Sequence, residues 1–173
     1  MLITPIKEIK VDGGNRKWVG TKNNGVFLMS EDGTTQIQHF TKENSPLLNN
    51  TVSEICVLDN SGTVFFVTNF GLCSYRANSS ASQNSFDNVI VFPNPVKQNY
   101  QGLIAISGLK EKTNIKITDI VGNLVFETQS VGGTATWNGK NFDGNRVATG
   151  VYLFLCVDSD FNEHVVKKIL IYN

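Results

Sequence analysis

The sequence predicts an all-β protein, and three features of its pattern indicate this. No ten-residue window combines apolar residues at the i, i+3, i+4 and i+7 positions of an amphipathic helix with capping residues at its ends. Short β-branched or aromatic runs recur instead at intervals of about ten residues, separated by Gly, Asn, Asp and Ser. The 15 glycines and the low charged fraction of 17% are typical of a turn-rich protein. Together these features favour a sandwich, a barrel or a propeller.

The first half of the chain repeats itself after 46 residues. Each copy has an apolar strand, a turn with Asp and Gly, an aromatic strand ending in Thr, a second turn and a third strand. These segments are 6–11, 12–15, 18–21, 23–25 and 26–28 in the first copy, and 52–57, 59–62, 65–68, 69–71 and 72–75 in the second. Such a period, with three or four strands per copy, is typical of propeller blades, which bury their faces against neighbouring blades.

The two copies differ in how they end. The first has a further predicted strand at 34–40, whereas the second continues into the polar sequence ANSSASQNS at 77–85. We therefore predict two partial propeller blades in residues 1–78 and a linker over residues 79–87. A closed propeller needs about four to eight blades, so we expect more blades and an export signal upstream. We also expect the two blades alone to be marginally stable, since they expose a face that a neighbour would cover.

The second half contains seven short apolar runs separated by turn residues. They occupy residues 89–92, 103–106, 115–120, 124–126, 134–137, 151–157 and 164–171. Seven short strands in about 85 residues predict an immunoglobulin-like sandwich over residues 88–173. We expect Trp137 in the core of this sandwich and Trp18 in the core of the blades.

Two of these runs show the period-two alternation of strands with one buried face. In the second run we expect Leu103 and Ala105 to form the apolar face. In the third run we expect Ile115 and Ile117 to face inward, with Lys116 and Thr118 facing solvent.

Charge and hydropathy exclude some classes of function. Lys plus Arg and Asp plus Glu are 15 each, so the basic excess of a typical nucleic-acid binder is absent. No apolar run approaches the roughly 18 residues of a membrane span. The sequence MLITPIKEIK at residues 1–10 lacks the regions of a signal peptide.

The residues with reactive side chains predict no enzyme, no cofactor and no metal site. His39 and His164 stand in no recognisable nucleophile or metal-binding motif, and we expect both at surface or edge positions. Each of the three cysteines, Cys56, Cys73 and Cys156, lies in an apolar run and is expected to be a buried small hydrophobe. A disulfide between Cys56 and Cys73 would require neighbouring strands, which the sequence does not decide.

Four aspartates stand beside Gly or Asn, and calcium-binding loops also use spaced Asp and Asn residues. The segments DGGN, EDGT, DNSG and DGNR do not supply the spaced oxygen ligands and the terminal bidentate acid that such a loop needs. We therefore expect Asp12, Asp32, Asp59 and Asp143 to form turns.

Two family resemblances follow from longer segments. The segments NRKWVGTKNNGVF at 15–27 and NSPLLNNTVSEI at 44–55 resemble the propeller repeats of the periplasmic sensor region of Bacteroidetes two-component regulators. The second half carries VFPNPV, IKITDIVGNLV and WNGKNFDGNRVATGVYLF, which resemble the C-terminal sorting domain of the type IX (Por) secretion system. The last of these also resembles the immunoglobulin-like domain of flagellar hook-cap proteins, so by itself it indicates fold more than function.

The combination implies a non-catalytic component of the type IX secretion and cell-surface attachment machinery. The resemblance implies export to the cell surface or outer membrane, with secretion-system proteins as partners and lipopolysaccharide or another glycan as a ligand of the complete propeller. The C-terminal domain would serve in translocation and docking. Two alternatives stay open, namely a secreted cargo protein whose sorting domain is cleaved and a periplasmic propeller ligand sensor.

The resemblance also singles out the final strand, because in this family that strand is part of the secretion signal. The candidate secretion or docking residues are Lys167, Lys168, Ile169, Leu170 and Ile171. The alternative for the two lysines is edge protection, since Lys on an exposed strand discourages pairing with other sheets.

Overall fold

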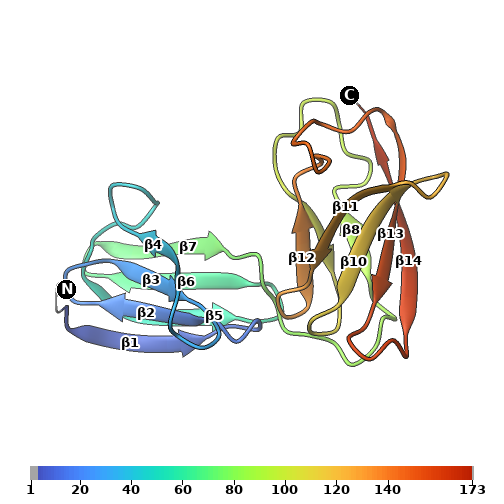
Figure 1. The fold of residues 1–173 in the computed structure, drawn as a ribbon. Coiled ribbons are helices and arrows are strands. Elements are labelled where there is room, and N and C mark those ends of the chain that lie inside the picture. Colours follow the sequence, from blue (N-terminus) through green and yellow to red (C-terminus); the bar gives the residue numbers. More distant parts are fainter. Residues whose placement is uncertain (1–3, 173) are drawn as a thin grey trace. The chain divides into compact units, whose positions relative to one another are not determined.

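The computed structural model describes residues 4–172, which form fourteen β-strands and no helix (Figure 1). The all-β prediction is confirmed. The chain divides into two compact units, one ending at Ala81 and the other beginning at Ser82. The first unit contains β1 (Ile6–Val11), β2 (Lys17–Thr21), β3 (Val26–Met29), β4 (Gln36–Phe40), β5 (Val52–Leu58), β6 (Thr63–Thr68) and β7 (Gly71–Arg76). The second contains β8 (Ile90–Phe92), β9 (Ile104–Ser107), β10 (Asn114–Asp119), β11 (Leu124–Gln129), β12 (Thr134–Trp137), β13 (Gly150–Val157) and β14 (His164–Ile171).

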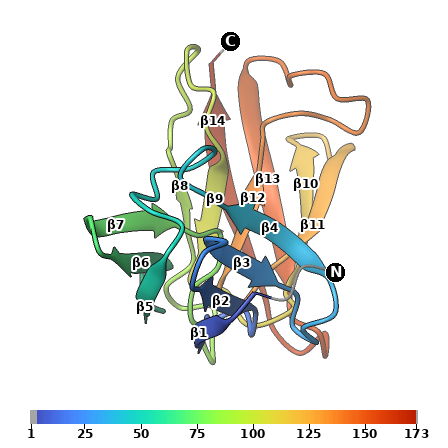
Figure 2. The same ribbon diagram turned by 90° about the vertical axis from the view of Figure 1, so that its left-hand side faces the viewer.

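The first unit consists of two antiparallel sheets that share one core. Figure 2 shows the four-stranded sheet β1-β2-β3-β4 and the three-stranded sheet β5-β6-β7. Each sheet follows chain order, because short turns join consecutive strands. The second sheet lacks a fourth strand among the described residues, as the sequence predicted. The core holds Trp18, Val26, Leu28 and Phe40 from the first sheet and Val52, Ile55, Val64 and Phe66 from the second.

Trp18 is fully buried and organises the aromatic part of this core, as predicted. Its ring centroid lies 5.5 Å from that of Phe40, 5.7 Å from that of Phe66 and 6.0 Å from that of Tyr75. These spacings are those of stacked and tilted aromatic pairs. The aromatic residues of the two copies therefore meet between the two sheets.

The turn between β1 and β2 is built around a buried charge. The Asp12 carboxylate accepts hydrogen bonds from the backbone N–H groups of Gly14 and Arg16, and from Trp18 Nε1 at 3.0 Å. Arg16 Nη2 donates to Asp12 Oδ2 at 2.7 Å, with both side chains almost fully buried. Burial of this ion pair is tolerated because its donors and acceptors are largely paired within the turn.

The turn prediction for the four aspartates holds in different ways. The carboxylates of Asp12 and Asp32 accept the N–H two residues on, in Gly14 and Thr34. In the turn that contains Asp143, the Asn141 side chain accepts the backbone N–H groups of Asp143 and Asn145, and the Asp143 carboxylate accepts from Asn141 Nδ2 at 3.3 Å. Asp59 contributes its backbone carbonyl, to the N–H of Ala81.

Residues in the predicted linker, 79–87, are more ordered than their polar composition indicated. Ser79 and Ser80 are buried in the first unit, and Phe86 belongs to the core of the second. Arg16 Nη1 donates to Asn78 Oδ1 at 2.7 Å, which holds this segment against the β1–β2 turn. A Cβ atom at Gly13 would lie 2.3 Å from the Ser80 carbonyl carbon, so the close approach requires glycine there.

The second unit contains two antiparallel sheets, β11-β10-β13-β14 and β12-β9-β8, and all seven predicted strands are present. Their inner faces enclose one apolar core, which includes Ile104, Ile106, Ile115, Ile117 and Ile169. Trp137 is buried in it, as predicted. Its ring centroid lies 5.9 Å from that of Tyr152 and 5.8 Å from that of Phe154.

The structure corrects two predicted strand faces. In β9 the buried residues are Ile104 and Ile106, whereas Leu103 precedes the strand and is 52% exposed. The predicted phase was wrong by one residue, and such a shift exchanges the two faces of a strand. In β10, Lys116 is exposed as predicted, but Thr118 is buried. The pairing of β10 with β11 shifts register between Ile117 and Thr118, which interrupts the alternation there.

The three cysteines are all free, and their environments differ. Cys156 is buried as predicted and Cys73 is half-buried, but Cys56 is exposed, so its predicted burial was wrong. Cys56 lies on β5 and Cys73 on β7, and β6 separates these two strands. Because β5 and β7 are not neighbours, the condition for the disulfide is not met.

Candidate docking site on the last strand

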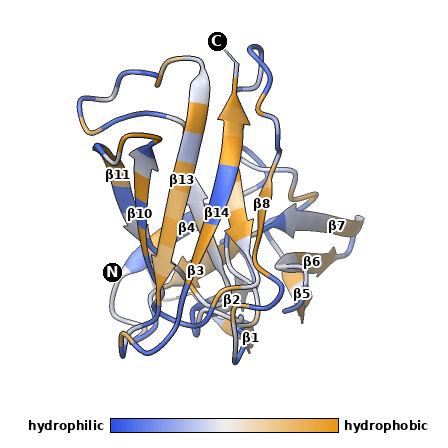
Figure 3. Cartoon of the chain, turned by 90° about the vertical axis from the view of Figure 1, so that its right-hand side faces the viewer, coloured by the Kyte–Doolittle hydropathy of each residue, from blue (hydrophilic) through white to orange (hydrophobic). Residues whose placement is uncertain are grey.

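Strand β14 lies at the edge of its sheet, and β13 is its neighbour in the sheet order. Ile169 and Ile171 are buried on the core face, and Lys167 lies on that same side, opposite Phe154 in the register. Lys168 is exposed on the outer face. Figure 3 shows the result, a hydrophilic segment within an otherwise largely hydrophobic strand.

The five candidate residues of this strand do not form one surface. Ile169 and Ile171 are 1% exposed and act as core residues, while Leu170 is half-buried on the outer face. Only Lys167 and Lys168 carry polar groups that a partner can contact. An inward-pointing charge on an edge strand also opposes unwanted sheet pairing, so the edge-protection alternative remains compatible with this geometry.

The C-terminal half of the β14 edge is capped by the segment after β8. Asn94 Nδ2 donates to the Lys168 carbonyl at 3.1 Å, and Asn94 Oδ1 accepts the Leu170 N–H at 3.2 Å. Val96 continues the cap, since its N–H donates to the Leu170 carbonyl and its carbonyl accepts the Tyr172 N–H. The outward backbone groups from the Lys168 carbonyl to the Tyr172 N–H thus have the partners that a neighbouring strand would provide.

Sequence reasoning missed this role of Asn94 and Val96. The segment Pro93-Asn94-Pro95 lies between two apolar runs and within the VFPNPV motif, and neither pattern predicts a strand cap. The available signal was an amide side chain between two residues that lack a backbone N–H, because there the side chain is a natural substitute for the missing strand donors.

The N-terminal half of the β14 edge is open. Since the Leu170 backbone points away from β13, strand alternation makes the backbones of His164 and Val166 point the same way. Among the described residues, no hydrogen-bond partner is assigned to the N–H or C=O of Val166. This stretch is an unpaired strand edge.

A groove of about 450 Å³ lies beside this open edge, between β14 and β8. Strand β8 is the edge of the opposite sheet, and the two strands lie side by side (Figure 3). The lining includes Ile90 from β8, Leu153 from β13, and Val166, Lys167 and Lys168 from β14. The groove therefore combines apolar side chains, two ammonium groups and backbone edge.

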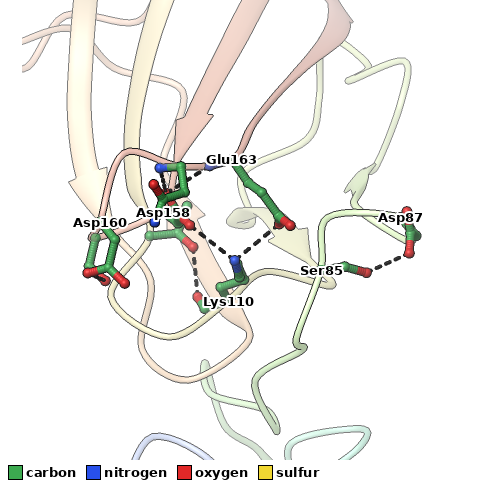
Figure 4. Close-up of polar contacts among 9 residues, drawn as sticks. Ser85, Asp87, Lys110, Asp158, Asp160 and Glu163 are labelled. Carbon is green, nitrogen blue, oxygen red and sulfur yellow. Dashed lines mark hydrogen bonds and ion pairs between the residues drawn. The ribbon is translucent and has the colours of Figure 1, made fainter.

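The turn that precedes β14 is held by a charge cluster. Figure 4 shows Lys110 between two carboxylates, with Nζ 3.0 Å from Asp158 Oδ2 and 3.1 Å from Glu163 Oε2. Asp158 Oδ1 also accepts the backbone N–H groups of Asn162 and Glu163. The hydrogen bond from Ser85 to Asp87 lies apart from this cluster. The cluster fixes the β13–β14 turn, and with it the start of β14.

The electrostatics of the cluster follow from these contacts. Hydrogen bonds to Asp158 and Glu163 raise the pKa of Lys110. Burial acts to raise the pKa of Asp158, but hydrogen bonds from the Glu163 N–H, Lys110 and the Asn162 N–H outweigh it and lower that pKa. Both shifts favour the charged forms, as expected of an ion pair that stabilises a turn.

The described part of the chain offers little else with reactive chemistry. No group of three or more His, Cys, Asp or Glu residues within 4–172 is placed to hold a metal ion. His39 lies on the edge strand β4, where it stacks on Phe27 with ring centroids 4.0 Å apart, and His164 is exposed at the start of β14. None of the described residues forms a helix with the length and apolarity needed to cross a membrane.

Comparison with known proteins gives one family match and one informative structural match. Residues 90–172 match the model of the secretion system C-terminal sorting domain. The whole chain is similar to PorZ of Porphyromonas gingivalis, described as an essential bacterial surface component of the type IX secretion system, with 34% identity and a TM-score of 0.67. The match covers 98% of this chain and 23% of the PorZ chain, so the chain spans about a quarter of that relative.

Weaker structural similarities carry no argument. One is to dimeric latent PorU of P. gingivalis, at 20% identity and a TM-score of 0.39 over 64% of this chain and 12% of that one. Another is to the extracellular domain of a one-component system of B. thetaiotaomicron, at 13% identity and a TM-score of 0.32 over 97% of this chain and 25% of that one. No curated protein matches the chain.

The family model and the PorZ similarity agree with the geometry of the second unit and with the sequence motifs. Residues 90–172 belong to the family of secretion system C-terminal sorting domains, and the chain as a whole is similar to the C-terminal region of a PorZ-like protein of the type IX secretion system.

Proposed function

We propose that the chain is part of a non-catalytic component of the type IX secretion and surface-attachment machinery. In this proposal the first unit is two blades of a larger propeller. The second is an immunoglobulin-like domain that serves in translocation and docking and is retained on the mature protein. The protein resides at the cell surface or outer membrane, its partners are secretion-system proteins there, and the complete propeller presents a surface for lipopolysaccharide or another glycan.

One observation carries the proposal. The similarity to PorZ extends over 98% of the chain at 34% identity, so it includes the repeated sheets and the sorting domain together. A sorting domain alone would fit a secreted cargo protein equally well, since cargo proteins carry the same kind of sorting domain. The two-sheet first unit directly before the sorting domain is what favours a machinery component.

The test is intact mass and C-terminal peptide mapping of the full-length protein recovered from the native cell surface. Recovery of peptides from the last strand, 164–171, is the expected result and means that the domain is retained. A chain that ends near residues 79–87 would mean that the domain is a sorting signal that is cleaved off after secretion. The cargo alternative would then replace the proposal.

A second experiment tests the docking role directly. Deletion of residues 88–173 from the full-length protein is expected to abolish its surface display, measured by protease accessibility on intact cells. The matched control keeps the domain and replaces Phe142, an exposed aromatic residue, with Ala. Unchanged surface display after the deletion would contradict the docking role.

A further inference from the structure

We propose that the groove between β8 and β14 binds an extended acidic peptide segment of a partner protein, which adds to the open edge of β14 as a further strand. The inference deepens the proposed function, on which it rests for the identity of the partner as a secretion component. It replaces a general docking surface with one strand edge and one class of ligand.

The backbone provides the first argument. Val166 has both its N–H and its C=O directed away from β13 and without an assigned partner among the described residues, and the same alternation applies to His164. The open stretch is short, because the turn held by Lys110 limits it on one side and Asn94 caps it from the Lys168 carbonyl onward. Peptides that add to a sheet edge bind through such main-chain groups.

Charge provides the second argument. Lys167 and Lys168 line the groove, no acidic side chain lines it, and neither lysine has an ion pair assigned within residues 4–172. Elsewhere in the second unit a lysine is paired, as Lys110 is with Asp158 and Glu163. Two unpaired ammonium groups beside a strand edge are complementary to a segment with carboxylates.

The apolar lining completes the recognition pattern. Ile90 and Val166 are each more than half exposed, and Leu153 contributes from the neighbouring strand. Successive side chains of an added strand point to opposite faces, so a segment that alternates apolar and acidic residues satisfies both kinds of lining. A second copy of this chain is a poor occupant. Pairing of two copies through the same edge would bring their lysines close together, and like charges across paired strands repel each other.

The probe is a fluorescein-labelled synthetic peptide of about eight alternating Val and Glu residues, the length of a common strand. Its binding to the full chain is measured by fluorescence anisotropy, against the same peptide with Lys in place of Glu. The acidic peptide is expected to bind, to weaken as salt rises, and to slow hydrogen exchange at the Val166 amide. Equal binding of the basic peptide, no binding, or an unchanged Val166 amide would each overturn the proposal.

Two variants test the two arguments separately. The double variant Lys167→Glu with Lys168→Glu is expected to weaken binding of the acidic peptide about tenfold or more. Val166→Pro removes an outward N–H that β13 does not use, so the chain is expected to fold while binding is lost. The control is Lys116→Glu, which makes one of the same charge reversals on the exposed side of β10. Equal weakening by this control would contradict a local site.

These outcomes are separable from those of the proposed function. If the peptide does not bind but deletion of residues 88–173 abolishes surface display, the groove assignment is wrong and the docking role stands. If the peptide binds in the groove but the deletion leaves display unchanged, the groove is a peptide site and the docking role is wrong.

Discussion

The two units close their apolar cores in different ways. In the second unit, the inner faces of both sheets cover each other, and even the edge strand β14 buries Ile169 and Ile171. In the first unit, β5 buries Val52 and Ile55 between the sheets, while the equivalent positions of the repeat in β1, Ile6 and Ile9, are more than half exposed. The same sequence pattern therefore gives burial only where another sheet covers it. A stack of sheets stays open at its end, whereas two facing sheets enclose their core.

The difference between the units is expected to appear most strongly in their response to loss of a core side chain. Trp137→Ala removes a fully enclosed aromatic residue that contacts Tyr152 and Phe154. We expect a loss of about 3–5 kcal/mol in the free energy of unfolding of the second unit. Hydrogen exchange resolved by peptide measures this, with protection lost in β9–β14 before β1–β7.

The control for this substitution is Phe142→Ala in the same unit. Phe142 is largely exposed and contacts Phe126 at a centroid distance of 5.7 Å. A loss below about 1 kcal/mol is expected, as for surface substitutions. Comparable losses for both variants would mean that Trp137 does not anchor the core.

In the first unit, the largest effect is expected from the buried ion pair rather than from a cavity. Asp12→Asn leaves the Arg16 guanidinium buried without its carboxylate. We expect a loss of about 3 kcal/mol, since breaking one side of a buried pair costs more than the pair contributes. Thermal unfolding followed by tryptophan fluorescence measures it, because Trp18 Nε1 bonds to the same carboxylate.

Asp143→Asn is the matched control for the ion pair. Asp143 is exposed, and the backbone N–H groups of its turn donate to Asn141 rather than to the Asp143 carboxylate. The free energy of unfolding is expected to change by less than about 0.5 kcal/mol. If Asp12→Asn also changed the free energy of unfolding by less than about 0.5 kcal/mol, the stability of the first unit would not depend on its buried ion pair.

A smaller effect is expected at the turn before β14, and it depends on pH. The lowered pKa of Asp158 gives stability that is present above its unfolded pKa of about 3.9 and is lost as pH falls through the folded value. The raised pKa of Lys110 gives stability present below about 10.4 that is lost as pH rises through its folded value. Urea unfolding at a series of pH values should therefore show a plateau between these limits.

Lys110→Met distinguishes this turn from the rest of the protein. It removes the ammonium group, whose Nζ lies 5.7 Å from the centroid of the Phe86 ring, and keeps most of the aliphatic stem. The fall in stability above about pH 10 is expected to shrink in this variant. An unchanged profile would mean that other groups cause the alkaline loss.

The sequence was sufficient to predict what depends on local pattern. All seven strands of the second half, the strand ending at Phe40 and the burial of both tryptophans could be read from apolar runs between turn residues. These features depend on residues a few positions apart, where alternation and turn chemistry act directly.

Features that depend on distant residues could not be read in this way. The cap on β14 joins Asn94 to Lys168 and Leu170, more than 70 positions away in the chain. The burial of Thr118 follows from a register shift against β11, and Cys56 is exposed because it lies on the face of β5 opposite to the buried Ile55. Apolar neighbours predict that a residue lies in a strand, but sheet order decides whether that strand is covered. For the candidate site, the lysines of the last strand could be named from the resemblance, whereas the open edge beside Val166 required the strand pairing.

The smallest expected effect concerns the thiols, which report on the same contrast without perturbing the fold. Burial raises the pKa of Cys156 to about 12, so its thiolate is scarce at neutral pH and shielded by the second core. Cys56 is exposed on an edge strand of the first unit. Alkylation by iodoacetamide, followed by peptide mass spectrometry, should therefore modify Cys56 first and Cys156 last. Replacing the exposed thiol, in Cys56→Ser, should change the free energy of unfolding by less than about 0.5 kcal/mol. Early modification of Cys156 would instead mean that the second core opens readily, which would contradict a core enclosed by a closed pair of sheets.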